Sequence, residues 1–274
     1  MKKTNDTPAP APAPRKRVKS RLDVALVDRG LVETRTRAQS LIMARRVLVN
    51  EQFVDKPGAS VTDDDVLRVA EPEHPWVGRG GIKLAHALQQ FGIDVRGKIC
   101  ADIGASTGGF TDVLLQNGAR KLYAIDVGYG QLDASLRNDP RVVNREKVNA
   151  RFLQPSDFDE PVDFVAIDVS FISLRLILPA VAKFARGELV ALIKPQFEVG
   201  RGEVGKGGIV RDDAKREAAV QSVVEFARAL GFEVRGVIES PIKGAEGNVE
   251  YLMNCRLLTG EVRSSKEELG MKNS

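Results

Sequence analysis

The sequence predicts an α/β protein in which a small α+β domain precedes a larger domain with a doubly wound parallel sheet. The chain has 274 residues, 43% of them hydrophobic, which at about 150 residues per domain fits two globular domains. From about residue 82 onward, strand-like and helix-like segments alternate, as they do in parallel sheets covered by helices on both faces. A stretch rich in proline and glycine, residues 71–81 (EPEHPWVGRGG), separates this part from a shorter one before it.

Composition divides the chain further. Residues 7–14 (TPAPAPAP) alternate proline with alanine, so they are expected to form an extended tether without a core. The predicted segments are a basic, Pro/Ala-rich tail (1–20), a small domain (21–70), a linker (71–81), a larger domain (82–260) and a C-terminal tail (261–274).

In the small domain, two helices are expected before a small sheet. The first carries an apolar stripe that begins at Leu22 and closes at Gly30, a residue suited to a C-cap. Thr34 or Thr36 can cap the second helix, which we expect to run to about Arg46. The predicted strands cover residues 47–50, 53–54 and 66–70.

In the larger domain, apolar runs bounded by turns predict six strands. The last two lie close together in sequence, separated by the loop 241–248, which suggests a reversed strand at one edge of the sheet. The predicted strands are residues 98–104, 121–127, 163–169, 188–194, 232–239 and 250–256, with helices at 175–185 and 212–230.

Several classes of protein are excluded by what the sequence lacks. No run of about 18 uncharged apolar residues exists, so no membrane-spanning helix is predicted. The basic start has no apolar segment behind it, so we expect a cytoplasmic protein rather than a secreted one. Cys100 and Cys255 lie far apart in strand-like segments, and His74 and His86 have no metal-ligand spacing, so neither a disulfide framework nor a metal site is expected.

Basic residues gather in the N-terminal part of the chain. Five of the seven residues from 15 to 21 are basic. On the second helix, the residues expected outside the apolar stripe are Arg35, Arg37, Gln39, Arg45 and Arg46. Such a face is either solvated or in contact with phosphates, which arginine binds through two parallel hydrogen bonds.

The segment RLDVALVDRGLVETRTRAQSLIMARRVLVNEQFV resembles the RNA-binding module named after ribosomal protein S-four. The pattern of that module has a glycine where this chain has Arg46. The resemblance implies that these basic residues bind RNA, and the charge distribution agrees with it.

A glycine-rich loop follows the first strand of the larger domain, where open α/β sheets bind their ligands. Its sequence, ADIGASTGGF, has Ser106 where a dinucleotide-binding loop needs glycine, which argues against NAD. Asp102 precedes the first glycine, and Asp126 ends the next strand, where a carboxylate can accept ribose hydroxyls. The loop and the two carboxylates together indicate S-adenosylmethionine, with another nucleotide as the alternative.

Four charged residues lie where burial is expected: Lys83, Asp168, Lys194 and Glu250. Taken singly, each could be a surface charge at the end of a strand. As a set they abut apolar strands, need partners and balance to zero net charge. A desolvated lysine beside a second cation can lose its proton and act as a base. A sugar hydroxyl needs such a base, because it is a poor nucleophile until its proton is removed.

The order Lys-Asp-Lys-Glu on such a fold resembles the tetrad of FtsJ-type ribose 2'-O-methyltransferases. With GRGGIKL, DIGASTGGFTD, AIDVSFISL, LIKPQFE and GNVEYL, the chain resembles the TlyA family over residues 21–257. This resemblance implies a Rossmann-like methyltransferase domain that uses S-adenosylmethionine to methylate cytidine riboses in small- or large-subunit rRNA.

The resemblance also implies roles for individual residues. Lys194 would be the general base, and Lys83, Asp168 and Glu250 would position and tune it. The residues expected to hold or line the methyl donor are Asp102, Gly104, Ala105, Ser106, Thr107, Gly108, Phe110 and Asp126. The expected partners are rRNA and ribosomal subunits, with neither a membrane nor a metal, and the chain is expected to be a monomer.

Two other functions are compatible with parts of the sequence. One is an RNA-binding ribosome-assembly factor whose methyl-donor site is vestigial; the intact tetrad argues against it. The other is a membrane-active hemolysin, the older label of the family. Residues 212–230 form the best helix for such a role, but they have balanced charge and small apolar residues, typical of a helix that covers a sheet.

Overall fold

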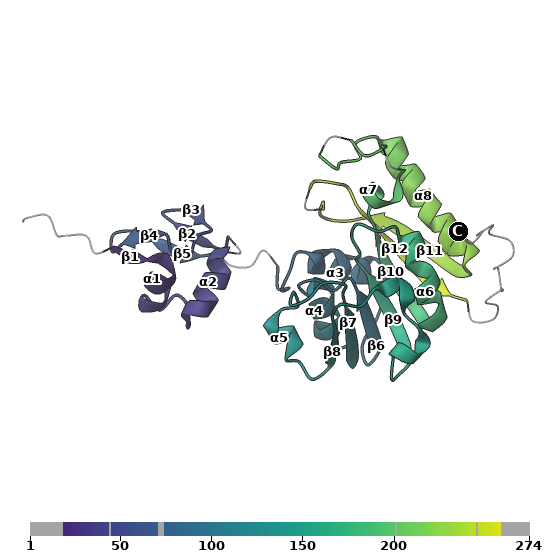
Figure 1. The fold of residues 1–274 in the computed structure, drawn as a ribbon, viewed down its shortest axis with the longest axis horizontal. Helices are drawn as coiled ribbons and strands as arrows, with labels where there is room; N and C mark the ends of the chain where they lie inside the picture. Colours follow the sequence, from purple (N-terminus) through teal and green to yellow (C-terminus); the bar gives the residue numbers. More distant parts are fainter. Residues whose placement is uncertain are drawn as a thin grey trace, which may run out of the picture. The chain divides into compact units, whose positions relative to one another are not determined.

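The computed structural model describes residues 19–43, 45–70, 74–200, 202–205, 207–244 and 246–258. The chain divides into two compact units, Met1–Pro75 and Trp76–Ser274 (Figure 1). The predicted C-terminal tail, and all of the predicted N-terminal tail except Lys19 and Ser20, lie outside the described residues.

The N-terminal unit is a small α+β structure. Its two helices pack on a core that includes Leu22, Ile42 and Val61. Strands β3, β2 and β5 form an antiparallel sheet, and β1 pairs with β4. The elements are β1 Lys19–Arg21, α1 Leu22–Asp28, α2 Arg35–Met43, β2 Val47–Val49, β3 Gln52–Val54, β4 Ser60–Thr62 and β5 Leu67–Val69.

Helix α2 is shorter than predicted. Thr34 Oγ1 accepts the Arg37 N–H (3.2 Å), as a capping residue does. The helix ends at Met43, and Arg45 has a φ of 54°, a left-handed conformation that cannot continue an α-helix. Arg45 and Arg46 therefore lie in the turn before β2 and not on the helix.

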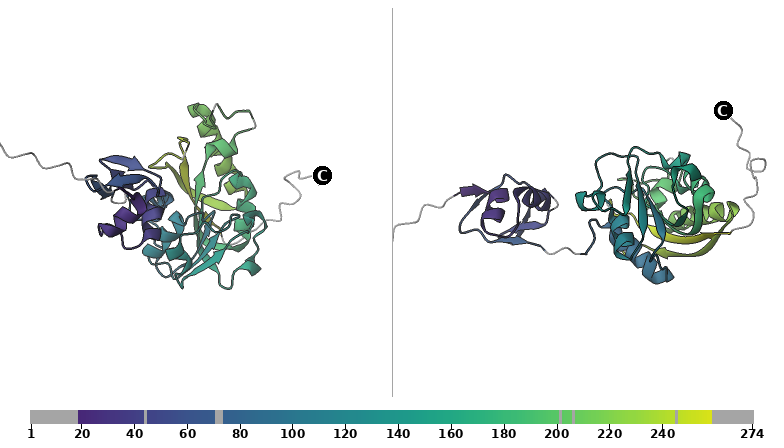
Figure 2. Two further views of the ribbon diagram at one scale, coloured as in Figure 1. Left: turned by 60° about the vertical axis from the view of Figure 1, so that its left-hand side comes forward. Right: turned by 90° about the horizontal axis from the view of Figure 1, so that it is seen from below.

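The C-terminal unit is a seven-stranded, mostly parallel sheet with helices on both faces (Figure 2), which confirms the predicted α/β class. The strands are β6 Ile99–Ile103, β7 Lys121–Ile125, β8 Val142–Arg145, β9 Val162–Ile167, β10 Ala185–Ile193, β11 Phe232–Glu239 and β12 Tyr251–Leu257. The α-helices are α3 Gly80–Phe91, α4 Gly109–Gln116, α5 Ala134–Arg137, α6 Leu178–Phe184, α7 Pro195–Glu198 and α8 Asp213–Ala229. Three 3-10 helices are Ala150–Phe152, Pro155–Asp157 and Leu174–Leu176.

Side chains alternate between two cores along the central strands. On β6, Ile99, Ala101 and Ile103 pack with residues of α6 and α8, whereas Cys100 packs with residues of α3 and α4. This alternation follows from the two-residue repeat of a strand. Both faces are apolar, so the central strands appear in the sequence as continuous apolar runs.

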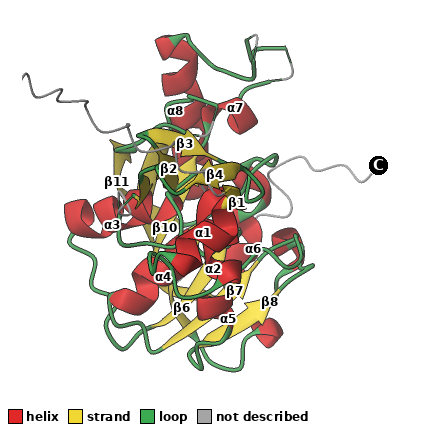
Figure 3. Cartoon of the chain, turned by 90° about the vertical axis from the view of Figure 1, so that its left-hand side faces the viewer, coloured by secondary structure: helices red, strands yellow, loops and turns green. Residues whose placement is uncertain are grey.

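The strand order corrects the predicted position of the reversed strand. The order is β11-β12-β10-β9-β6-β7-β8, and β12 is antiparallel to both of its neighbours. The reversed strand is thus second from the edge, between β10 and β11. The opposite edge strand is β8, beside β7 (Figure 3), and the sequence pattern did not predict it.

No helix in the described part of the chain combines the length and the apolar character needed to cross a membrane.

Cys100 and Cys255 are free and buried, and burial raises the pKa of each thiol to about 12. Neither thiol is suited to nucleophilic chemistry at neutral pH.

Candidate active site

The loop after β6 owes its shape to residues with positive φ. Gly104 has a φ of 88°, and a Cβ there would lie 2.3 Å from the Asp168 carbonyl oxygen, so the close approach of the two loops requires glycine. Ser106 has a φ of 48°. The position at which a dinucleotide loop carries glycine is thus left-handed here, although a serine occupies it.

A small pocket lies over this loop. Five of the eight residues expected to contact the methyl donor line it: Gly104, Ala105, Ser106, Thr107 and Phe110. Three further lining residues, Gly80, Gly109 and Asp168, were not assigned to the donor from the sequence. Asp168 therefore belongs both to the lining of this pocket and to the tetrad.

Asp126 holds the rim of the loop. One of its carboxylate oxygens accepts the Ser106 N–H (2.8 Å), and the other accepts the Gly128 N–H (2.6 Å). Each carboxylate oxygen can accept more than one hydrogen bond. The side chain thus has acceptor capacity left for a ligand hydroxyl.

Asp102 lies beneath the loop and not on the pocket surface. It is fully buried, and Thr111 Oγ1 donates to its Oδ2 (2.7 Å). No described residue forms a hydrogen bond with the other oxygen, Oδ1. Burial raises the pKa of Asp102 from its usual 3.8 to about 7, because desolvation disfavours the charged form.

Asp102 is expected to make stability depend on pH. Its pKa is higher in the folded chain than in the unfolded chain, so folding binds a proton between about pH 4 and pH 7. The free energy of unfolding should fall as the pH rises through this window, by up to about 1.4 kcal/mol per pH unit, and change little above it. Denaturant titrations followed by fluorescence of Trp76, the only tryptophan, would measure this.

Asp102→Asn has no group to titrate, so its unfolding free energy should be less sensitive to pH in that window. Asp28→Asn, at an exposed aspartate on α1, is the matched control and should keep the wild-type slope. An unchanged slope in Asp102→Asn would contradict the prediction.

Lys194 and Asp168 form an ion pair at the carboxyl ends of neighbouring strands. Asp168 Oδ1 lies 2.6 Å from Lys194 Nζ, and Lys194 is 9% exposed. Because β9 and β10 are parallel and in register at Ile167 and Ala191, the residues that follow them meet at one edge. Lys194 begins a turn whose next residue is Pro195, the first residue of α7.

Lys83 and Glu250 form a second, more buried pair. Lys83 Nζ lies 2.5 Å from Glu250 Oε2, and the two residues are 8% and 3% exposed. Glu250 precedes β12 and faces the position of Lys194, because β10 and β12 pair as far as Ile193 and Tyr251. The four tetrad residues thus meet at one edge of the sheet as two lysine–carboxylate pairs.

The loop after β9 adds residues that the sequence prediction missed. Lys194 Nζ donates to Ser170 Oγ (2.7 Å). Phe171 has a φ of 63°, is 89% exposed and packs on Phe197, with ring centroids 5.2 Å apart and ring planes tilted by 50°. Serine and phenylalanine in a loop have no periodic signal, although both stand in the motif AIDVSFISL.

Glu198 connects this loop to the turn after Lys194. Its carboxylate accepts the Ser173 hydroxyl (2.5 Å) and the Leu174 N–H (2.7 Å). Burial raises the pKa of Glu198, and these hydrogen bonds oppose the rise. The loop after β9 and the segment after β10 are therefore connected at two places: by the ion pair of Asp168 with Lys194 and by the hydrogen bonds of Glu198.

In the N-terminal unit, two residues of the predicted RNA-binding set bind a buried carboxylate. Asp23 is fully buried and accepts hydrogen bonds from Arg21, Arg35 and Gln39 at 2.8–3.1 Å. Arg35 keeps an exposed side chain. The hydrogen bond from Arg21, followed by those from Gln39 and Arg35, holds the pKa of Asp23 well below its usual range.

The other three basic residues differ in their surroundings. Arg46 donates from Nη2 to the Ala70 carbonyl oxygen (2.9 Å). Arg37 and Arg45 are exposed, and their guanidinium groups have no hydrogen-bond or ion-pair partner among the described residues. These two side chains are therefore the ones most open to an external anion.

Removing the Asp23 carboxylate is expected to loosen α2. Asp23→Ala leaves three donors without their shared acceptor, which should lower local stability by about 2 kcal/mol. Hydrogen exchange in the segment Arg35–Met43 should become faster. Asp28→Ala, on the exposed side of the same helix α1, is the control and should leave exchange unchanged; equal rates in Asp23→Ala would contradict the prediction.

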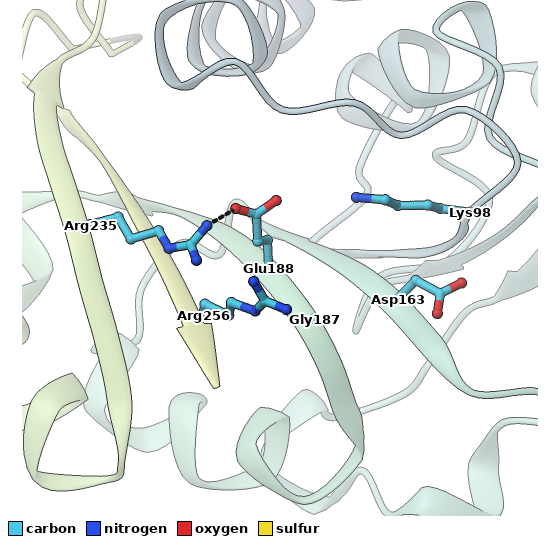
Figure 4. A pocket seen from close by; sticks show the side chains of 6 residues that line it. All are labelled: Lys98, Asp163, Gly187, Glu188, Arg235 and Arg256. Carbon is cyan, nitrogen blue, oxygen red and sulfur yellow. Dashed lines mark hydrogen bonds and ion pairs between the residues drawn. The ribbon is translucent and has the colours of Figure 1, made fainter. Parts of the chain in front are cut away.

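A larger hollow lies at the other end of the strands from the tetrad, where β6, β9 and β10 begin (Figure 4). It is lined by Lys98, Asp163, Gly187, Glu188, Arg235 and Arg256. Glu188 pairs with Arg235 (2.5 Å), and Asp163 accepts the Ile99 N–H (3.0 Å). The two carboxylates of the hollow offset most of the charge of its three basic residues, and no tetrad residue lines it. The hollow is therefore not the candidate site of methyl transfer.

Two known families match the two units. The family described as FtsJ-like methyltransferase matches residues 76–256, and the S4 domain family matches residues 20–67. Both matches agree with the resemblance seen in the sequence motifs.

Individual relatives match nearly the whole chain. A candidate rRNA methyltransferase of Bacillus subtilis, YqxC, is 49% identical and covers 86% of this chain and 85% of its own length. The 16S/23S rRNA (cytidine-2'-O)-methyltransferase TlyA of Mycobacterium tuberculosis is 47% identical, with coverage of 90% and 94%. A solved structure of a candidate hemolysin from Streptococcus thermophilus is 45% identical, with a TM-score of 0.70 and coverage of 90% and 91%.

Proposed function

The chain belongs to the TlyA family of FtsJ-like methyltransferases, and from this premise we propose that it methylates the ribose 2'-hydroxyl of a cytidine in rRNA. The observation that carries the proposal is the ion pair of the buried Lys194 with Asp168, a residue that also lines the glycine-rich pocket. A base next to a nucleotide-type pocket is what transfer to a hydroxyl requires.

The fold and the family imply S-adenosylmethionine as the methyl donor, and the residues of the pocket fit it. The loop from Gly104 to Thr107 leaves a cradle, and Asp126, at the rim of this loop, has acceptor capacity for ribose hydroxyls. When bound, this donor supplies a methyl group activated by a positively charged sulfur.

The chain's own residues supply the proton chemistry. In the mechanism we infer, Lys194 Nζ in its uncharged form accepts the proton of the 2'-hydroxyl as the methyl group is transferred. Asp168 stabilises the ammonium that results. The Lys83–Glu250 pair adds no net charge and fixes α3 against β12 beside the site.

RNA would be held by both units. In the N-terminal unit, Arg37 and Arg45 are free to bind phosphates, and Arg35 presents part of its guanidinium.

In the C-terminal unit, exposed aromatic rings follow three strands at their carboxyl ends, the end of the sheet that carries the tetrad. These are Tyr129 after β7, Phe152 after β8 and Phe171 after β9, which are 72%, 68% and 89% exposed.

Two of these rings have a cation beside them. Lys147 Nζ lies 4.5 Å from the Tyr129 ring centroid, and Arg151 Cζ lies 5.7 Å from that of Phe152. Aromatic rings stack on unpaired bases, and cations bind the adjoining phosphates. We infer that the target nucleotide leaves its stack and that its base contacts Phe171, next to Asp168 and Ser170. The reaction would take place in the cytoplasm, where ribosomal subunits are found.

The test uses radiolabelled S-adenosylmethionine with each ribosomal subunit, intact ribosomes and naked rRNA. We expect label in the rRNA of at least one subunit, at a cytidine whose 3'-phosphodiester resists alkali because its 2'-oxygen is methylated. Donor binding without label in any rRNA would contradict the proposal and favour the assembly factor. Leakage of liposomes with pure protein would support the hemolysin function instead.

A further inference from the structure

The hydrogen bond between Lys194 and Ser170 has a consequence for how the base works. A neutral lysine amine carries two N–H groups and one lone pair, and only the lone pair can accept the proton of a hydroxyl. The amine rotates about its Cε–Nζ bond unless its N–H groups are held. Whatever holds them determines where the lone pair points.

Two described residues surround Lys194 Nζ in different ways. Ser170 Oγ lies 2.7 Å away and accepts a directed hydrogen bond. Asp168 Oδ1 lies 2.6 Å away, but its contact with Lys194 is an ion pair without the direction of a hydrogen bond. Ser170 is therefore the described residue that fixes the direction of an N–H group.

We propose that Ser170 is a positioning residue: it holds one N–H group of Lys194 beside Asp168, and so directs the lone pair of the amine toward the 2'-hydroxyl. The oxygen of that hydroxyl forms a bond to the methyl carbon, the bond from this carbon to sulfur breaks with its electron pair going to sulfur, and the proton passes to Lys194 Nζ. This inference rests on the proposed function for its substrate but not for the bond itself.

The surroundings of Ser170 suit this role. It is exposed and lies in the loop after β9, whose later residues are fixed by Glu198 through Ser173 and Leu174. The ring contact between Phe171 and Phe197 holds the middle of the same loop. The residues that follow Ser170 in the loop are thus anchored by these contacts.

The first measurement needs no substrate. In the full chain labelled with ¹⁵N-lysine, a hydrogen-bonded side-chain amine exchanges its protons slowly enough to give a ¹H–¹⁵N signal, and Lys194→Ala identifies that of Lys194. We expect the signal to disappear in Ser170→Ala and to persist in Ser170→Thr, which keeps a hydroxyl. The Lys83 signal, from the pair with Glu250, is the internal control and should be unchanged in both variants.

The second measurement is kinetic. Ser170→Ala should lower kcat by about tenfold or more, since a misdirected base loses efficiency, while KM for the methyl donor and affinity for RNA stay within about twofold of wild type. Ser170→Thr should restore most of the rate. A persistent Lys194 signal in Ser170→Ala, or an unchanged kcat, would overturn the proposal. Absence of transfer by the wild-type chain would refute the proposed function, and the spectra would still test the hydrogen bond.

Discussion

Replacing Lys194 by alanine is expected to lower the rate of methyl transfer by about 10²–10⁴-fold, the usual contribution of a general base. Lys194 is the buried amine that contacts both Asp168 and Ser170, and it does not line the pocket over the glycine-rich loop. Affinity for the methyl donor and for RNA should therefore stay within about threefold of wild type. Single-turnover transfer, donor calorimetry and RNA binding measure the three quantities separately.

Two further variants sharpen this test. Lys194→Arg keeps a positive charge beside Asp168 but cannot give up its proton, so it should be as inactive as Lys194→Ala. Lys98→Ala, just before β6 at the other end of the strands from the tetrad, is the matched control and should transfer at the wild-type rate. If Lys194→Arg kept most of the activity, Lys194 would act as a fixed charge and not as a base.

Some strands could be predicted from the sequence and others could not, because only some of them leave a local pattern of apolar residues. Strand β11 was predicted with the bounds that the structure has, because apolar and charged residues alternate along its first half. Strand β6 was predicted to within one residue at each end, because it is a buried, mostly apolar run. Strand β8 has four half-buried residues at the edge of the sheet, so it lacks an apolar run. The position of β12 between β10 and β11 depends on which strands pair, and pairing leaves no pattern in the local sequence.

The candidate site divides in the same way. Lys194 and Asp168 could be singled out because a charge that ends an apolar strand is conspicuous in a sequence, but which lysine pairs with which carboxylate depends on register between strands. Ser170 and Glu198 act through contacts across loops, so no spacing in the sequence marked them. Their roles, like those of the tetrad, stay predictions until the variants are measured.

The N-terminal unit shows how a tertiary contact changes the meaning of a sequence pattern. Arg35 and Gln39 fall on the polar side of an amphipathic helix, which is typical of a solvated or phosphate-binding face. Both instead donate to Asp23, a buried residue from the preceding helix. Their effect on RNA binding would therefore include holding the shape of the unit, while Arg37 and Arg45 remain available for direct contact.

Breaking the Lys83–Glu250 pair is expected to have the largest effect on stability. Lys83→Met or Glu250→Leu alone leaves one charge in a site where the two residues are 8% and 3% exposed, and such losses typically cost about 3–5 kcal/mol. The double variant Lys83→Met/Glu250→Leu should recover most of this loss, because apolar residues can replace a buried pair at little cost. Urea unfolding followed by Trp76 fluorescence measures all three variants.

The double variant separates stability from catalysis. Lys215→Met, which breaks an exposed contact of 3.7 Å with Glu203, is the matched control and should change stability by less than about 1 kcal/mol. If the pair shapes the electrostatics around Lys194, the double variant should stay at least about tenfold slower than wild type although it is folded. If it transferred at the wild-type rate, the pair would only hold α3 against β12, and the chemistry would belong to Lys194 and Asp168 alone.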